Sequence, residues 1–235
     1  MYLEGEFVMK VRIKFSKKGV MKYIGHLDLQ RYFQKAIRRA GIDIAYSSGY
    51  SPHQIMSFAS PLGVGLESEG EYFDIELLSA TSMEVIVSRL DATMAEGMKV
   101  INAVVLPDNV KNAMASIEAA NYFVTTSNKE LSSLFTKDKI DEFLSQDEII
   151  VSKESKKSTR ELDIKPLIYS ITAVEGGVNM LVCASSAGNI KPQLVVDAIA
   201  SKNDMLVGEF DLGITRIDLY SMTETGQLRS LGDIE

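Results

Sequence analysis

The chain has 235 residues, one cysteine and a net charge of −7 at neutral pH. This length permits one large domain or two of about 100 to 120 residues each, without any need for disulfides. One cysteine excludes an internal disulfide and a three-cysteine iron-sulfur motif, and two histidines argue against a histidine-rich zinc site, so we expect neither a metal nor a cofactor. Because no long apolar run and no secretory signal are visible, we expect a cytoplasmic protein that does not contact membranes.

Positive charge is concentrated towards the N-terminus. Residues 1–60 hold ten lysines and arginines against four acids, a balance of +6, so the remaining residues sum to −13. This asymmetry predicts a basic face on an acidic body, which suits selective contact with nucleic acid or docking to an acidic partner. A solvated face without a partner is the alternative.

In chain order, residues 1–8 read as an extension and residues 9–107 as a first unit. The segment "MKVRIKFSK" alternates apolar and basic residues with a period of two, which indicates a half-buried strand. From about His26 to Ala40 the apolar residues follow helical spacing, and Gly41 stands where a left-handed cap is expected. "IDIAYS" and "EYFDIELL" alternate as strands, "SMEVIVSRLDATMAEG" is helical with Ser82 as its cap, and "MKVINAVVL" closes the unit.

Residues 108–113 form the expected join, residues 114–223 a second unit and residues 224–235 a tail. "KDKIDEFLSQ" predicts a short helix, and "EIIVSKES" and "RELDIKPLIYSITAVEGGVNMLVCAS" predict strands with a hairpin turn at Gly176 and Gly177. "KPQLVVDAIAS" is a helix and "DLGITRIDLYSM" a last strand. The element order predicts an α+β protein made of two ferredoxin-like (βαββαβ) units packed together, with antiparallel sheets and helices on one face.

Basic residues lie on three of these elements, where they could bind RNA phosphates. On the first helix, Arg31, Lys35 and Arg38 have i, i+4, i+7 spacing and project to one side, with Arg39 beside them. The other candidates are on the first strand, Arg12 and Lys14, and at the tip of a later hairpin, Lys156, Lys157 and Arg160. The alternative is that these charges only keep the surface soluble.

The stretch "YSSGYSPHQIMSFASPLGVGLESEGEY" is longer than a simple connection requires. Its glycines do not have the spacing of the dinucleotide-binding fingerprint, and a strand follows where that motif needs a helix. Long polar loops with aromatic residues are often functional, so we interpret it as a binding loop with Tyr46, Tyr50, Ser51 and His53 as its contacts.

The two histidines, His26 and His53, both fall in or beside loops of the first unit. Histidine titrates near neutral pH and can move protons in the cleavage of RNA, so these two residues form a catalytic hypothesis. Each could equally cap a helix or hold its own turn, and we assign no catalytic residue.

The motifs "HLDL", "RRAG", "GYSPH" and "FASPLGVGLESEGEY", with the later "KKSTRELDIKPLI", resemble the radical-SAM-linked (radical-SAM-associated) protein family, a bacterial domain of unassigned function. The resemblance spans nearly the whole chain. It implies a domain fused to, or encoded beside, a radical SAM protein with a cobalamin-binding region. The chain has no radical SAM cysteine motif of its own, so it would be the free-standing partner.

Together these observations favour a non-enzymatic accessory protein that binds RNA or presents a substrate to a radical SAM enzyme in RNA modification or processing. The expected partners are the radical SAM protein and RNA. Two alternatives stay open: a metal-independent endoribonuclease that uses His26 or His53, and a protein-docking domain without affinity for RNA.

Overall fold

The computed structural model describes residues 8–155, 158–186 and 188–234. Its internal contacts divide the chain into two compact units: unit 1 comprises residues 1–117 and 218–235, and unit 2 comprises residues 118–217. Unit 2 is thus an insertion in unit 1. This division differs from the expected boundaries because the residues after 217, which include the expected tail, return to the first unit.

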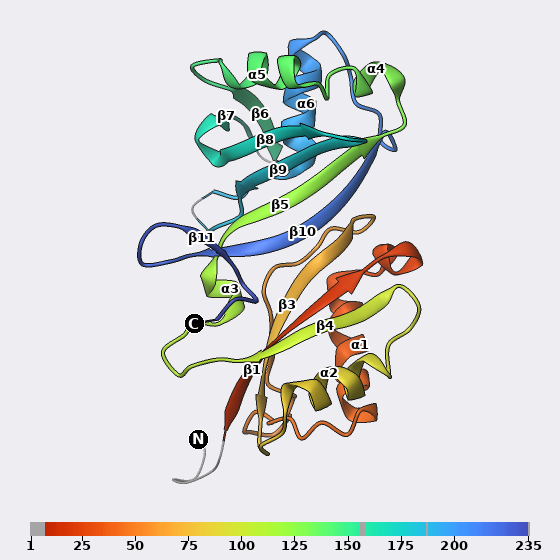
Figure 1. Cartoon of the computed structure of the whole chain (residues 1–235), viewed down its shortest axis with the longest axis vertical. Coiled ribbons are helices and arrows are strands. Elements are labelled where there is room, and N and C mark those ends of the chain that lie inside the picture. The colour runs from red at the N-terminus through yellow and green to blue at the C-terminus, as the bar shows by residue number, and fades with distance from the viewer. Residues whose placement is uncertain (1–7, 156–157, 187, 235) are drawn as a thin grey trace. The chain divides into compact units, whose positions relative to one another are not determined.

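Unit 1 contains most of the strands and helices that position the candidate site. Within residues 1–117 the elements are β1 (Met9–Lys17), the 3₁₀ helix η1 (Gly19–Tyr23), α1 (His26–Arg39), β2 (Met56–Phe58), β3 (Glu67–Leu77), α2 (Met83–Asp91), β4 (Met98–Val105) and α3 (Ala113–Ser116). β1 pairs antiparallel with both β3 and β4, and β2 pairs antiparallel with β3 (Figure 1). β10 (Leu212–Met222) is also a neighbour of β3, and β11 (Leu228–Ser230) pairs with β10.

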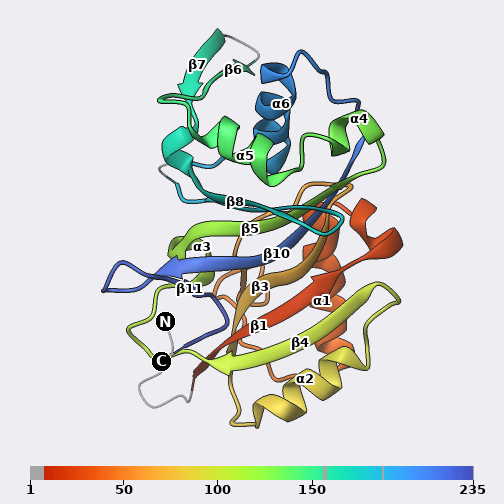
Figure 2. The same cartoon turned by 45° about the horizontal axis from the view of Figure 1, so that its top comes forward.

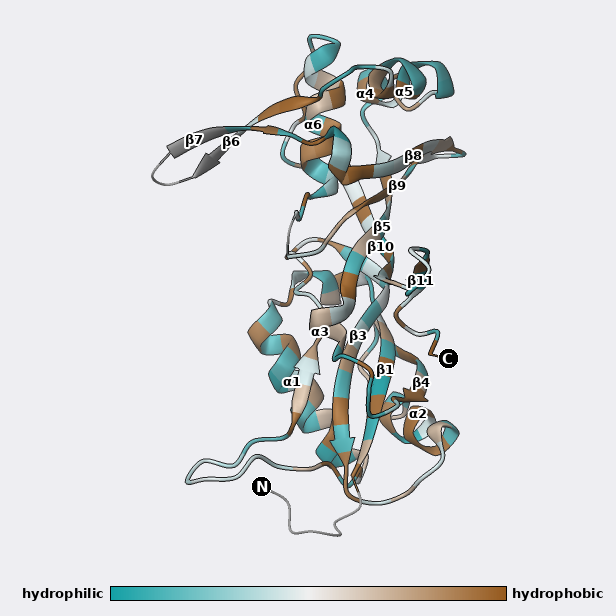
Figure 3. Cartoon of the chain, turned by 90° about the vertical axis from the view of Figure 1, so that its left-hand side faces the viewer, coloured by the Kyte–Doolittle hydropathy of each residue, from teal (hydrophilic) through white to brown (hydrophobic). Residues whose placement is uncertain are grey.

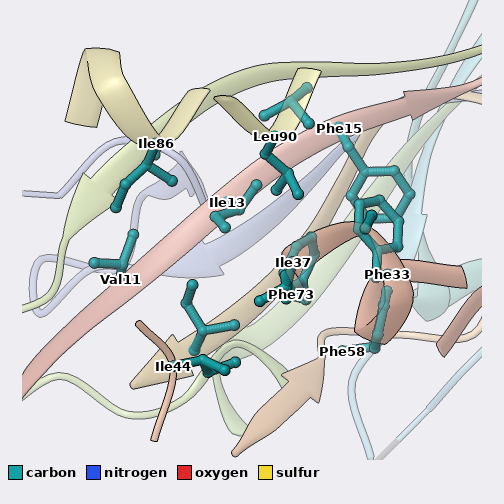
Figure 4. Packing of buried hydrophobic residues seen from close by; sticks show 14 of the residues in the cluster. Val11, Ile13, Phe15, Phe33, Ile37, Ile44, Phe58, Phe73, Ile86 and Leu90 are labelled. Atoms are coloured by element: carbon teal, nitrogen blue, oxygen red, sulfur yellow. The ribbon is translucent and has the colours of Figure 1, made fainter. Parts of the chain in front are cut away.

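α1 and α2 cover one face of this sheet (Figure 2). Alternate residues of β1, among them Ile13 and Phe15, point towards the helices and are fully buried. Phe33 of α1 packs against Phe15 and Phe73, with ring centroids 4.7 Å away in both pairs (Figure 4). Burial of such large apolar side chains stabilises a fold by about 1.5–3 kcal/mol each, so this cluster fixes the position of α1 on the sheet.

The opposite face of the unit 1 sheet carries buried charges. Arg12 is 2% exposed, and its guanidinium donates to both oxygens of Asp74, with Nε–Oδ1 at 2.8 Å and Nη2–Oδ2 at 3.0 Å. It also donates to the backbone carbonyls of Lys111 and Leu231. The segment after β4 and the C-terminal segment therefore cover this face, although the alternating sequence predicts that it faces solvent.

Unit 2 has its own strands and helices. They are β5 (Ile117–Thr126), α4 (Lys129–Ser132), α5 (Lys137–Leu144), β6 (Ile150–Ser155), β7 (Ser158–Asp163), the 3₁₀ helix η2 (Lys165–Leu167), β8 (Ile168–Val174), β9 (Gly177–Cys183) and α6 (Pro192–Lys202). β9 lies between β5 and β8 with antiparallel pairing on both sides, and β6 and β7 form a separate two-stranded sheet. α5 contacts both β8 and α6.

The α+β class is confirmed, and antiparallel pairing prevails, but two ferredoxin-like units are not confirmed. The predicted strand "IDIAYS" forms only isolated bridges, Ile44 with Leu77 and Tyr46 with Gln54. Several local predictions are confirmed: Gly41 has a φ of +63°, and the hydroxyl of Ser82 accepts a hydrogen bond from the backbone N–H of Val85 at 3.4 Å.

Candidate nucleic-acid interface

The polar side of α1 carries a basic ridge, which we define as Arg31, Lys35 and Arg38. All three are exposed, whereas Leu29, Phe33, Ala36 and Ile37 on the other side of the helix are buried. Figure 3 shows the resulting alternation of hydrophilic and hydrophobic bands along α1. The helix forms because its apolar residues recur at helical spacing and can pack on the sheet, which leaves the ridge facing solvent.

Few partners neutralise the ridge. Arg31 contacts Asp28 at 3.3 Å, but both side chains are about 70% exposed, and such surface pairs contribute little. Lys35 has no ion pair with any described residue, and Arg38 donates from Nε to the backbone carbonyl of Gln34 at 3.3 Å. The ridge therefore retains most of its positive charge for a ligand.

Residues 46–54 form a hairpin-like segment that we call the tyrosine loop. Its two arms are joined by hydrogen bonds from the N–H of Ser47 to the carbonyl of His53, at 2.8 Å, and from the N–H of His53 to the hydroxyl of Ser47, at 3.1 Å. Gly49 has a φ of +108°, which glycine adopts without strain and which allows the chain to reverse. At the tip Tyr50 is fully exposed, and Tyr46 at the base is 48% exposed.

Gln54 connects the tyrosine loop to the basic ridge. It is only 6% exposed, and its Nε2 donates to the carbonyl of Gln34 at 3.3 Å and to the hydroxyl of Tyr46 at 3.4 Å. Since Arg38 donates to the same carbonyl, the ridge and the loop meet at this backbone atom. The Oε1 of Gln54 is buried and has no hydrogen-bond partner among the described residues.

Gln54 was not among the residues that the sequence predicted for the site. Nothing in its sequence neighbourhood marks it, because a glutamine after "SPH" is compatible with any polar loop. Only the tertiary contact with α1 shows that it links the two predicted features.

Three of the predicted phosphate contacts lie elsewhere. Arg12 forms a buried ion pair with Asp74 inside unit 1. The Nζ of Lys14 donates to Asp218 at 2.9 Å, and the Lys14 side chain is only 22% exposed. Arg39 is exposed, but its Nη2 donates to the carbonyl of Thr93, beyond the end of α2, at 3.2 Å. The surface that the geometry supports therefore consists of the basic ridge and the tyrosine loop.

The two histidines have separate partners. His26, the first residue of α1, lies 3.1 Å from the amide nitrogen of Gln30, and its ring meets the ring of Phe58 edge-on with centroids 5.6 Å apart. His53 is held by the Ser47 hydroxyl, 2.8 Å from its Nδ1. These contacts give both histidines a structural role in their own segments. His53 also belongs to the tyrosine loop.

Residues 10–192 match the family described as "Uncharacterized protein conserved in bacteria (DUF2344)". The chain belongs to this family. The match includes the whole basic ridge and the tyrosine loop, and it ends at the first residue of α6. The sequence-based expectation of a bacterial domain without an assigned function is confirmed to this extent.

Comparison with solved structures and curated proteins adds no function to this membership. A crystal structure described as an unknown protein from Galdieria sulphuraria aligns with 92% of this chain and 100% of its own, at 13% identity and a TM-score of 0.27. No curated protein matches the chain significantly.

Of the remaining predicted contacts, only Arg160 belongs to a described strand. The backbone of Arg160 is in β7, opposite Lys153 of β6, which agrees with the predicted hairpin. Lys156 and Lys157 lie outside the described residues. The hairpin is not needed for the surface formed by the ridge and the loop.

The described part of the chain, residues 8–234 with short gaps, holds no group of three or more His, Cys, Asp or Glu residues that could bind a metal ion. In the same part, no helix is long and apolar enough to cross a membrane.

Proposed function

We propose that this protein is a non-enzymatic RNA-binding accessory protein that presents RNA to a radical SAM enzyme of the cobalamin-binding type. The observation that carries the proposal is the joining of the basic ridge to the tyrosine loop at the carbonyl of Gln34. The ridge offers positive charge to phosphates, and the loop beside it offers exposed aromatic rings to bases.

The ridge is suited to a phosphate backbone. Arg31, Lys35 and Arg38 lie on one side of α1 and span about 10 Å along its axis, given a rise of about 1.5 Å per residue. Each contact between a cation and a phosphate releases a counterion, so the resulting affinity falls as salt rises. The acidic balance of the whole chain limits indiscriminate binding and restricts RNA to this surface.

The tyrosine loop favours single-stranded RNA. Tyr50 projects at the tip with nothing covering it, and stacking of an unpaired base on an aromatic ring contributes about 1–3 kcal/mol. Tyr46, half-exposed at the base of the same loop, offers a second aromatic ring to an unpaired base. Bases of a duplex are stacked within the helix and cannot reach these groups.

The partner is proposed from the resemblance to the radical-SAM-linked family. We further propose that unit 1 has a variant of the ferredoxin-like fold. Two features support this view: the antiparallel pairing of β1 with β3 and β4 and of β2 with β3, and the placement of α1 after β1 and of α2 after β3.

The proposal is tested by fluorescence anisotropy with a labelled single-stranded RNA of about twelve nucleotides, a length in the usual range of single-strand sites. The double variant Lys35→Gln/Arg38→Gln should bind roughly tenfold or more weakly, with the slope of log affinity against log salt flatter by about 1.4. Lys99→Gln is the matched control, because Lys99 is exposed on β4 and has no ion pair with a described residue.

Equal affinity of the wild type and the double variant would show that RNA does not bind at the ridge. A denaturing gel of the same mixtures separates binding from catalysis. If the wild type cleaves the RNA and His26→Ala or His53→Ala does not, the non-enzymatic assignment is wrong. Co-elution of the protein with the purified radical SAM protein in size-exclusion chromatography tests the proposed partner.

A further inference from the structure

Unit 2 contains a cavity of about 540 Å³ between the start of β6 and α6. This volume is within the range of about 300–1,000 Å³ that is common for binding sites. Residues 149–152 line one side and residues of α6 line the other, with Phe143 of α5 and Gln146 completing the lining. The basic ridge and the tyrosine loop belong to unit 1, so the inference from this cavity does not depend on the proposed function.

The cavity lies along the edge of β6 rather than over one of its faces. Successive side chains of a strand point to opposite faces, so a cavity over one face touches alternate residues. This cavity touches four residues in succession: Ile149, Ile150, Val151 and Ser152. It therefore lies beside the backbone of the strand.

The backbone groups on this edge have no partner in the described chain. Among the described residues, β6 pairs with no strand except β7. The N–H of Ile164 donates to the carbonyl of Ile149 at 2.9 Å, so these two residues form a hydrogen-bonded pair. Such pairs alternate along an antiparallel ladder with pairs that share no hydrogen bond. The next bonded residue is thus Val151, and the N–H and C=O groups of Ile150 and Ser152 point away from β7, towards the cavity.

One side of α6 forms the opposite wall (Figure 2). The residues that it contributes have i, i+3, i+4, i+7 spacing and therefore lie on one side of the helix: Leu194, Asp197, Ala198 and Ser201. They span about 10 Å, given a rise of about 1.5 Å per residue. About three residues of an extended strand, at about 3.3 Å each, have the same length. The space therefore suits one short extended segment.

The apolar part of the lining is accessible to such a segment. Leu194 and Ala198 of α6 are half-buried, and Ile150 is 51% exposed. An apolar side chain placed against these residues would be removed from water together with them, which stabilises a complex.

The charge of the lining is negative. Asp197 is exposed and accepts a hydrogen bond from the uncharged amide of Gln193 at 2.9 Å, and it has no ion pair with a described residue. Lys202 already lies 3.9 Å from the carboxylate of Glu142 and donates to the carbonyl of the same residue. The carboxylate of Asp197 therefore retains its charge and complements a basic side chain.

We propose that the edge of β6 binds an extended peptide segment of a partner protein. The segment adds a strand beside β6 through main-chain hydrogen bonds to Ile150 and Ser152, with an apolar side chain against α6 and a basic side chain at Asp197. Exposed strand edges bind peptides in this way: backbone hydrogen bonds provide affinity, and alternate side chains provide specificity.

The probe is a random heptapeptide library displayed on phage and selected on the full chain. Enriched peptides should contain an apolar and a basic residue, and fluorescence anisotropy with labelled synthetic copies should give a Kd of about 100 μM or below. Two further copies carry N-methyl groups on the two alternate sets of backbone amides. One copy should bind at least about tenfold more weakly than the other, because only one set of amides faces β6. This comparison uses the wild-type protein, so it is independent of whether any variant folds.

Variants then locate the site. Ser152→Pro removes an N–H that points away from β7, a position where an edge strand tolerates proline. It should weaken peptide binding about tenfold or more, which corresponds to about 1.4 kcal/mol. Ser152→Thr keeps the N–H and is the matched control, with affinity unchanged. Asp197→Asn should weaken binding of the peptides that contain a basic residue. Circular dichroism confirms that each variant is folded.

The proposal is overturned if the wild type enriches no peptides beyond those that Ser152→Pro enriches. Equal affinity of the selected peptide for the wild type and Ser152→Pro would also overturn it, as would equal affinities of the two N-methylated copies, because strand addition requires backbone donors on one edge. None of these measurements involves RNA, so their outcome is separate from that of the RNA-binding test.

Discussion

Single residues with the same charge have different roles in this protein. Arg12 and Arg38 both belong to the basic N-terminal part of the chain, but Arg12 is 2% exposed and Arg38 is exposed on α1. The difference arises from the cross-strand register, which places Asp74 directly opposite Arg12. A buried ion pair of this kind is costly to break, because removing one partner leaves the other as a buried charge without water or a counter-charge.

Asp74→Ala should lower the free energy of unfolding by about 3–5 kcal/mol, because it leaves the Arg12 guanidinium without a counter-charge. Glu69→Ala is the control on the same strand: Glu69 is 50% exposed and pairs with the exposed Lys18, so its loss should cost about 0–1 kcal/mol. Urea unfolding followed by circular dichroism measures both. Similar losses for the two variants would mean that the buried pair does not contribute more than the exposed one.

Tyr72 lies on β3, two residues before Asp74. Because its hydroxyl is buried, we expect the free energy of unfolding to fall at alkaline pH. Its hydroxyl donates to Asp218 at 2.5 Å, and burial, followed by the negative charge of Asp218, raises the pKa of Tyr72 far above its ordinary value. An unfolded tyrosine ionises at about pH 10, so above that pH the unfolded state loses a proton that the folded state keeps. Stability from this group is complete below pH 10 and should decline as pH rises further.

The measurement is the urea midpoint between about pH 9 and pH 11, on either side of the ordinary tyrosine pKa. Tyr72→Phe should be less stable at pH 9 and should lose less additional stability at pH 11 than the wild type. An identical pH dependence in both proteins would contradict the role of Tyr72.

At the scale of elements, the apolar periodicity predicts most helices and strands correctly. β1, α1, α2, α5 and β10 form within the segments that the sequence assigns to them, and α6 extends one residue beyond its predicted segment. The predicted turn of the β8–β9 hairpin is shifted by one residue: Val174 pairs with Gly177, so Glu175 and Gly176 form the turn. Gly177 is instead the first residue of β9, and the backbone of β5 lies close to its Cα.

Gly177→Ala should destabilise unit 2 by about 2 kcal/mol or more, because overpacking against an immobile backbone has this order of cost. A Cβ at Gly177 would lie 2.1 Å from the carbonyl oxygen of Val124 and 3.1 Å from the ring of Phe123. Gly63→Ala is the control, since its Cβ would make an ordinary contact with Leu66 at 3.5 Å. The thermal unfolding midpoints of the two variants test this prediction. Equal midpoints would contradict it.

At the scale of the whole molecule, the chain leaves unit 1 at residue 117 and returns to it at residue 218. The returning segment takes part in the fold: Leu231 is 1% exposed, and its carbonyl accepts from Arg12. Ser230 contributes its hydroxyl to the cluster around Asp218 and Tyr72. The residues that the sequence suggests as a tail therefore complete unit 1.

Deletion of residues 224–235 should loosen unit 1 and leave unit 2 largely unchanged, because it removes hydrogen bonds to Arg12 and Tyr72, which both belong to unit 1. Hydrogen–deuterium exchange measured by mass spectrometry should show faster exchange in peptides from β1 and β3. Peptides from β8 and β9 act as the internal control. Unchanged protection of β1 would show that the C-terminal segment is dispensable.

The sequence by itself determined the secondary structure and the basic side of α1, because both follow from local periodicity and charge. It also marked the tyrosine loop through its length and aromatic residues. Only the tertiary structure decided that Arg12 is buried, that Gln54 joins the loop to the ridge, and that the C-terminal residues belong to unit 1. These features depend on strand register and on contacts between distant segments, and a single sequence contains no periodic signal for either.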